Sequence, residues 1–166
     1  MLTVRRATRD DHKAIWTIIG PVIREGETYT LPRDMSEADA VGYWTGSDRQ
    51  TFVAEDGHAI VGTYYIRANQ LGGGSHVANC GYMTHAQARH KGVARAMFEH
   101  SLGEARRSGF RAMQFNFVVS TNERAVRLWQ SLQFQEVGRL PAAFQRPNGA
   151  FVDALVLFRE LTQAAT

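Results

Sequence analysis

The sequence predicts a mixed α/β (α+β) domain with one mixed sheet and the element order β-αα-βββ-α-β-α-ββ. Three observations indicate this class. Stretches with period-2 alternation and stretches with a helical stripe are interspersed along the chain. They do not alternate with the regularity of a doubly wound parallel sheet. The 166 residues, of which 44% are hydrophobic and 21% charged, suit one domain over 1–166 with a sizeable core.

The first third of the chain predicts a strand and two helices. LTVRRA alternates like a short strand, and Thr8–Asp11 has the form of a capping box in front of a helical stripe. Gly20-Pro21 should kink or divide that helix, because proline lacks a backbone donor. Ser36 opens a second, short helix, SEADAVGYW. The stripe of the first helix consists of Ile15, Trp16, Ile18, Ile19, Val22 and Ile23.

The middle of the chain predicts a hairpin, two further strands and a helix between them. TFVAEDG-HAIVGTYYIRA reads as the hairpin, HVANCGYMT as the next strand and FRAMQFNFVV as the strand after the helix. The helix spans Gly92–Ser108 and ends at Gly109. Its predicted buried face consists of Val93, Met97, Phe98, Ser101, Leu102 and Ala105.

The last third predicts one helix and two strands. The helix covers Asn122–Leu132, and the strands are FQEVGRL and FVDALVLFREL. The apolar stripe of this helix consists of Ala125, Leu128, Trp129 and Leu132.

Composition limits the partners and the compartment. The formal net charge of +3 mildly favours anionic ligands, but the basic residues are scattered, so we expect no nucleic-acid partner. The single cysteine, Cys80, excludes an intramolecular disulfide and suits a reducing compartment. MLTVRRATRD lacks the apolar segment of a signal peptide, and no apolar run approaches about 20 residues. We therefore expect a cytoplasmic protein with no membrane partner and no bound metal.

A basic turn before the middle helix predicts an anion site. The stretch RHKGVARAM, residues 89–97, places Gly92 at the start of that helix. A helix N-terminus presents unpaired N–H groups and the positive end of the helix dipole, which together favour phosphate. Arg89, Lys91 and Arg95 add positive charge there. The local pattern also fits a solvated basic turn that only caps the helix.

Two motifs of the chain resemble those of the GCN5-related N-acetyltransferase (GNAT) family. Arg89-x-x-Gly92-x-Ala94 is similar to the family's R/Q-x-x-G-x-G/A motif. Asn122-x-x-Ala125-x-x-Leu128 followed by Trp129 is similar to its second signature. The resemblance covers roughly residues 50–161. It implies a GNAT-like fold, a single N-acetyltransferase domain and acetyl-CoA as co-substrate.

The resemblance also implies where acetyl-CoA would bind. Its pyrophosphate would lie on the turn at 89–94, and its pantetheine would pair with backbone that is splayed open around Tyr82–Thr84. A homodimer is a further expectation. The residues expected to bind the donor are Tyr82, Met83, Thr84, Arg89, His90, Lys91, Gly92, Val93, Ala94, Arg95 and Asn122.

A closer resemblance concerns VGTYYIRAN, SHVANCGY, FNFVVSTN and VDALVLF, which are similar to fungal enzymes that N-acetylate proline analogues such as azetidine-2-carboxylate. It implies a small amine as partner, an amino acid or a proline analogue, held by asparagines at Asn79, Asn116 and Asn122. Asn116 also fits a structural amide in a central strand. The backbone near Tyr82 is the candidate oxyanion donor, so the predicted catalytic residues are Asn79, Asn116 and Tyr82.

The acid and the base of the reaction remain open. Many family members have a tyrosine acid where this chain has Trp129, and indole does not titrate, so we interpret Trp129 as core. SHVANCGYMT contains no carboxylate, so His76 or His85 is either the base or a solvated strand-end residue. Asp153 needs a partner, which is either structural or in the substrate pocket.

Other residues and functions stay in consideration. Cys80 is expected to pack as a small hydrophobe and not to act as a nucleophile. Thr28, Tyr29 and Thr30 lie on a loop that the family uses for acceptor recognition. A peptide N-acetyltransferase is an alternative, although no acidic run is present to attract a lysine-rich peptide. A non-catalytic acyl-CoA sensor is another, because the chain lacks both the tyrosine acid and the glutamate base that many family members have.

Overall fold

The computed structural model describes residues 1–161, and its element order is the one that the sequence predicts. Seven strands form one sheet in the order β1-β2-β3-β4-β5-β7-β6. No helix of the described part is long and apolar enough to cross a membrane. The elements are β1 (Leu2–Arg6), α1 (His12–Glu25), α2 (Glu37–Trp44), β2 (Gln50–Asp56), β3 (Ala59–Ala68), β4 (Val77–Thr84), α3 (Val93–Arg107), β5 (Ala112–Val119), α4 (Glu123–Ser131), β6 (Gln135–Gln145) and β7 (Phe151–Glu160).

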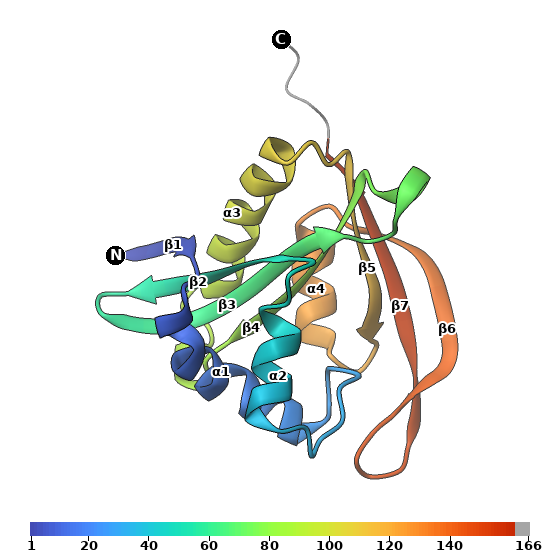
Figure 1. Cartoon of the computed structure of the whole chain (residues 1–166). Helices are drawn as coiled ribbons and strands as arrows, with labels where there is room; N and C mark the ends of the chain where they lie inside the picture. The colour runs from blue at the N-terminus through green and yellow to red at the C-terminus, as the bar shows by residue number, and fades with distance from the viewer. Residues whose placement is uncertain (162–166) are drawn as a thin grey trace.

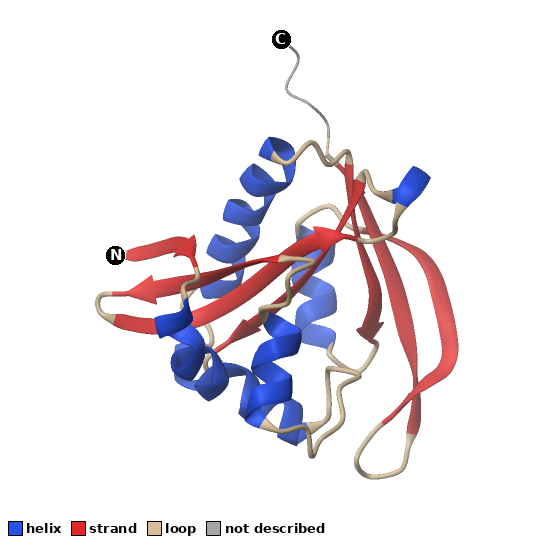
Figure 2. Cartoon of the chain, viewed as in Figure 1, coloured by secondary structure: helices blue, strands red, loops and turns tan. Residues whose placement is uncertain are grey.

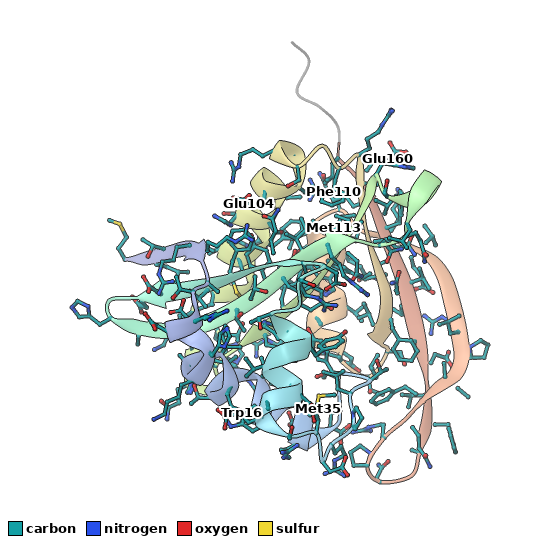
Figure 3. All side chains as sticks on the ribbon, in the orientation of Figure 1. Trp16, Met35, Glu104, Phe110, Met113 and Glu160 are labelled. Atoms are coloured by element: carbon teal, nitrogen blue, oxygen red, sulfur yellow. The ribbon has the colours of Figure 1, made fainter. Side chains whose placement is uncertain are left out.

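The sheet lies between two pairs of helices, with α1 and α2 on one face and α3 and α4 on the other (Figures 1 and 2). Isoleucines of α1 and Trp44 of α2 pack on one face against Val53, Tyr65 and Met83. The core on the other face contains Met97 and Phe98 of α3 together with aromatic residues of the sheet. Met113 of β5, labelled in Figure 3, is fully buried in this second core.

Strands β4 and β5 separate soon after they meet. They are parallel and pair only at Val77 with Ala112 and at Ala78 with Met113. Every other pair of neighbouring strands is antiparallel and has a longer ladder. Beyond Ala78 the edges of β4 and β5 therefore diverge, and the backbone groups that face the gap are not used by the sheet.

Three details differ from the sequence expectation. Strand β6 runs to Gln145, past the expected end at Leu140. Helix α1 runs unbroken through Gly20-Pro21. Pro21 has no N–H to donate to the carbonyl of Thr17, four residues earlier in the helix. Both residues are exposed, so water can hydrogen-bond to this carbonyl in place of the missing donor. Leu102 of α3 is half-buried at the edge of the core, although it lies on the predicted apolar face.

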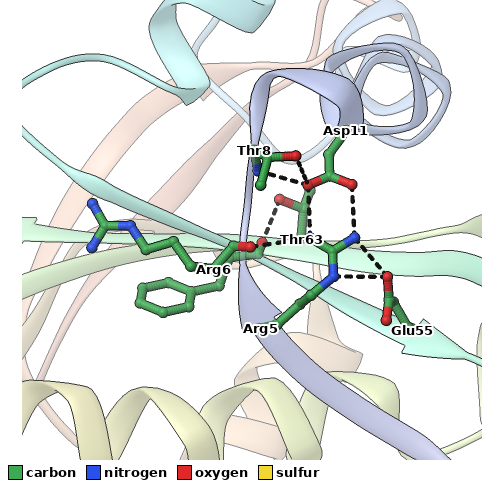
Figure 4. A network of polar contacts seen from close by, with 7 residues as sticks. Arg5, Arg6, Thr8, Asp11, Glu55 and Thr63 are labelled. Atoms are coloured by element: carbon green, nitrogen blue, oxygen red, sulfur yellow. Dashed lines mark hydrogen bonds and ion pairs between the residues drawn. The ribbon is translucent and has the colours of Figure 1, made fainter.

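An ionic cluster ties the start of the chain to the second strand (Figure 4). The Arg5 guanidinium donates to both carboxylate oxygens of Asp11, each at 2.8 Å, and also to Glu55. Asp11 Oδ2 accepts from the backbone N–H of Thr8 at 2.7 Å, which completes the predicted capping box. These contacts, led by the hydrogen bond from Arg5, lower the pKa of Asp11 from its ordinary 3.8 to about 2.

This shift predicts an acid-dependent loss of stability. A carboxyl whose pKa is lower in the folded state binds its proton more readily when unfolded, so its contribution is complete above about pH 4. We expect that contribution to disappear as the pH falls from about 4 to 2. Thermal melts of wild type and Asp11→Asn should differ at pH 7 and converge toward pH 2. A difference that stays constant over this range would contradict the assignment.

Candidate active site

Two cavities meet in the gap between β4 and β5. The turn cavity, about 670 Å³, lies against the residues that precede α3 and the first turns of α3 and α4. The strand cavity, about 290 Å³, lies over β3, β4 and β5. The residues that line both cavities are Thr28, Tyr29, Tyr82, Asn122, Ala125 and Trp129. A molecule in one cavity can therefore contact a molecule in the other at this junction.

The N-terminus of α3 has the form of an anion site. Gly92 adopts φ 77°, and a Cβ placed there would meet no atom within 4 Å. The first helical hydrogen bond runs from Ala96 N–H to the Gly92 carbonyl. The preceding N–H groups of residues 92–95 donate to no backbone or side-chain acceptor within residues 1–161. These N–H groups, next to the open space at Gly92, are suited to bind phosphate oxygens.

The structure brings the predicted donor-binding residues together, with one exception. The turn cavity is lined by Tyr82, Met83, Thr84, Arg89, His90, Gly92, Val93, Ala94, Arg95 and Asn122. Lys91 is exposed and does not line this cavity, because the turn directs it to solvent. Two cations of α4 that were not among the predicted residues, Arg124 and Arg127, line the same cavity. Their spacing of three residues on one polar face is the signal that was available.

The β4 backbone presents donors and acceptors to the gap at every second residue. The carbonyl of Val77 and the N–H of His85 form hydrogen bonds on the β3 side of the strand. The backbone N–H and C=O groups of the odd-numbered residues between them therefore also point toward β3. The N–H groups of Tyr82 and Thr84 therefore face the gap. On this side the Tyr29 hydroxyl donates to the Tyr82 carbonyl at 3.0 Å. The loop that carries Tyr29 is thus fixed to β4 at the junction of the two cavities.

Of the residues that line both cavities, Trp129 is buried and the others are half-buried. The Tyr82 hydroxyl forms a hydrogen bond with Ser101 Oγ at 2.7 Å inside the core. Tyr82 can therefore offer only its backbone groups to a ligand in the gap. Trp129 packs against Tyr82 and Phe115 with ring centroids 5.1 and 4.7 Å away, as predicted for a core residue. Burial raises the pKa of the Cys80 thiol to about 12, which agrees with its interpretation as a small hydrophobe.

The three predicted asparagines all line the strand cavity but make different contacts. Asn79 is 7% exposed, and its Nδ2 donates to the Gln114 carbonyl at 3.0 Å, across the point where β4 and β5 separate. Asn116 is exposed; it donates to Asn69 at 2.7 Å and accepts from Gln114 at 2.9 Å. Asn122 caps α4 by accepting from the Ala125 N–H. Each amide therefore has a structural contact as well as a place at the cavity.

The residues whose role the sequence left open lie elsewhere. His85 accepts from the Gln87 N–H and lines a separate hollow beside α1, and His76 lines neither cavity. Asp153 accepts from the Ala142 N–H at 3.0 Å and from Arg139 at 3.2 Å, so its partners are structural. These contacts lower the pKa of Asp153. Neither histidine nor Asp153 is placed to exchange a proton at the junction.

Comparison with known proteins identifies relatives over most of the chain. The sequence model of the acetyltransferase (GNAT) family matches residues 10–134. A GCN5-related N-acetyltransferase from Kribbella flavida is 38% identical, with a TM-score of 0.90 over 96% of this chain and 97% of that chain. A phosphinothricin acetyltransferase from Sinorhizobium meliloti, solved in complex with acetyl-CoA, has a TM-score of 0.85 at 22% identity over 99% of this chain and 93% of that chain.

A curated relative matches a shorter region. N-acetyltransferase aca1 of Schizosaccharomyces pombe is 33% identical over 99 residues, which are 59% of this chain and 47% of the relative. The aligned part thus spans about half the length of that relative.

Proposed function

The chain belongs to the acetyltransferase (GNAT) family, whose co-substrate is acetyl-CoA, and on this premise we propose that it transfers the acetyl group directly to the amine of a small molecule, an amino acid or a proline analogue. The observation that carries the proposal is the meeting of two cavities at the backbone of Tyr82. One cavity suits an anionic donor and the other a small acceptor.

The residues of the turn cavity fit acetyl-CoA. The N–H groups of residues 92–95 and the open space at Gly92 suit the pyrophosphate. Arg89, Arg95 and Arg124 line the cavity and compensate phosphate charge. The β4 backbone at Thr84 offers hydrogen bonds to the amide groups of pantetheine. When bound, acetyl-CoA supplies an activated acetyl thioester at the junction.

The strand cavity suits a small acceptor. Its volume of about 290 Å³ is at the lower end of the range for small-molecule sites. Tyr65 lines this cavity, and its ring lies so close to Gly81 that a Cβ there would approach the ring to 2.7 Å. No aspartate or glutamate of the described chain lines this cavity, so it lacks the charge that attracts a lysine side chain. These features favour a small molecule over a peptide.

The groups at the junction indicate how the chain assists transfer. The Tyr82 N–H faces the gap and can donate to an oxygen that gains negative charge; loss of one such donor typically costs about 3 kcal/mol. The Tyr29 hydroxyl stays protonated, since burial raises its pKa. No histidine or carboxylate of residues 1–161 lines the strand cavity, so the amine is expected to enter as its free base. Positioning of the two reactants is then the main contribution of the protein.

An acetyl-CoA-coupled assay over amino acids, cyclic imino acids, polyamines and lysine peptides tests this proposal. We expect free CoA to be released with at least one amino or imino acid and the N-acetyl product to be detected by mass spectrometry. Tight acetyl-CoA binding without turnover of any amine would instead indicate a non-catalytic sensor. Turnover confined to lysine peptides would favour the peptide alternative. A cytoplasmic location and a homodimer stay predictions.

A further inference from the structure

Arg67 on β3 has hydrogen-bonding capacity that the protein does not use. Its side chain lines the strand cavity, and its Nε is buried without a partner in the described part of the chain. Its Nη1 donates to Asp48 Oδ2 at 3.2 Å. A buried N–H of a charged group lowers stability unless it is hydrogen-bonded. The Arg67 side chain is 31% exposed, and Asp48 is its one acceptor among the described residues, so a ligand in the strand cavity can accept from the outer N–H groups of the guanidinium.

The charge around Arg67 is unbalanced toward the positive. Asp48 also binds Arg49, through Arg49 Nε at 2.7 Å and Arg49 Nη2 at 3.0 Å. The Arg49 guanidinium is stacked on the rings of Tyr43 and Tyr65, and its Nη1 is likewise buried without a partner among residues 1–161. Two guanidinium groups thus share one carboxylate. The excess of one positive charge matches a ligand with one negative charge.

The position of Arg67 relates this charge to the transfer site. Arg67 pairs with Asn79 in the β3–β4 register, and both line the strand cavity. Tyr82 lies three residues farther along β4, roughly 10 Å away. A molecule of amino-acid size, together with the long arginine side chain, spans this distance. The planar guanidinium is suited to a carboxylate, which it can bind through two donors.

We propose that Arg67 binds the carboxylate of the acceptor and thereby selects amino or imino acids over simple amines. This inference rests on the proposed function, and it adds the residue that recognises the carboxylate of the acceptor. Asp48, which also binds Arg49, accepts a hydrogen bond from the Arg67 guanidinium, while Asn79 lies opposite Arg67 across the strand pair. The amine of the bound acceptor is then directed toward the Tyr82 end of the cavity.

The test compares azetidine-2-carboxylate with azetidine-2-carboxamide, which carries the same amine without the negative charge. We expect wild type to prefer the carboxylate, and Arg67→Gln to lose about 100-fold in kcat/KM on it, since removal of one partner of a buried charged pair has effects of this order. On the carboxamide the loss should be less than about threefold, because no ion pair is removed there. Arg67→Lys keeps the positive charge but cannot donate two parallel hydrogen bonds to a carboxylate, so it should recover part of the activity.

Three controls separate recognition from folding. Arg139→Gln removes an exposed arginine of β6 that also pairs with a carboxylate, and should leave both acceptors unaffected. Asp48→Asn removes the protein partner of Arg67 but keeps Arg67, so it should retain the preference for the carboxylate. Acetyl-CoA affinity should be unchanged in all four variants.

The outcomes distinguish this inference from the function on which it rests. Equal losses on both acceptors in Arg67→Gln, no recovery in Arg67→Lys, or a wild type that accepts the carboxamide as well as the carboxylate would overturn the role of Arg67. Efficient turnover of polyamines with no turnover of amino or imino acids would also overturn it, and would leave acetyl transfer to an amine intact. A wild type that acetylates no amine at all contradicts the proposed function itself.

Discussion

Gly92→Glu should abolish the stabilisation of the protein by acetyl-CoA. The side chain would occupy the open space beside the N–H groups of residues 92–95 and place a negative charge where phosphate is expected. Juxtaposed like charges cost several kcal/mol, so we expect the affinity to fall by at least about 100-fold. A ligand at 100 times its Kd stabilises the folded state by about 2.7 kcal/mol, which a thermal melt detects easily.

Gly57→Glu is a matched control for this variant. Gly57 has φ 64° in the hairpin between β2 and β3, and a Cβ there also meets no atom within 4 Å. Both substitutions therefore add the same bulk, the same charge and a similar left-handed backbone strain. Gly57→Glu should lower the melting temperature to a similar extent but retain the full shift with acetyl-CoA. Wild-type donor affinity in Gly92→Glu would exclude the turn as the pyrophosphate site.

Asn79→Asp should nearly eliminate acetyl transfer while the protein still binds acetyl-CoA. The substitution keeps the shape of the side chain but removes the donor to the Gln114 carbonyl. It also places a carboxylate opposite Arg67, where it would compete with the carboxylate of the acceptor. A misplacement of about 1 Å can cost on the order of 100-fold in rate, and we expect a loss of at least this size in kcat/KM for the acceptor.

Two comparisons make the Asn79 result interpretable. Asn79→Ala should also be strongly impaired, since it leaves the Gln114 carbonyl without its donor. Asn148→Asp, in the turn between β6 and β7, adds the same charge outside both cavities and should behave as wild type. The measurements are initial rates at saturating acetyl-CoA and the thermal shift with acetyl-CoA. Full activity in Asn79→Ala would contradict this assignment. Loss of acetyl-CoA binding in Asn79→Asp or in Asn79→Ala would also contradict it.

The fold was predictable because its signals are local. Alternation, helical stripes and the capping residues Thr8, Ser36 and Asn122 place the elements to within a few residues. Continuity of α1 through Pro21 was not predictable, because it depends on the exposure of the carbonyl that proline leaves unpaired. The extension of β6 to Gln145 likewise depends on its pairing with β7 and not on its own residues.

The part of the site that consists of consecutive residues was predictable. The parts that depend on contacts between residues distant in the sequence were less so. The turn at 89–94 is a contiguous motif, and nearly all of its residues line one cavity. Arg67 has an ordinary place at the end of an apolar strand, and only the packing of residues 48 and 49 around it reveals an unused donor. The contact between Tyr29 and Tyr82 joins residues 53 positions apart, which no local pattern indicates.

The short pairing of β4 with β5 has a consequence for how the protein assembles. It divides the sheet into β1–β4, which precede residue 85, and β5–β7, which follow residue 111, so each half is contiguous in sequence. Most strand pairing then forms within a half, and the two halves also share the hydrophobic core under α3 and α4. We expect amide hydrogen exchange to show two cooperative units with different opening free energies. Substrates bound in the gap would hold these units together.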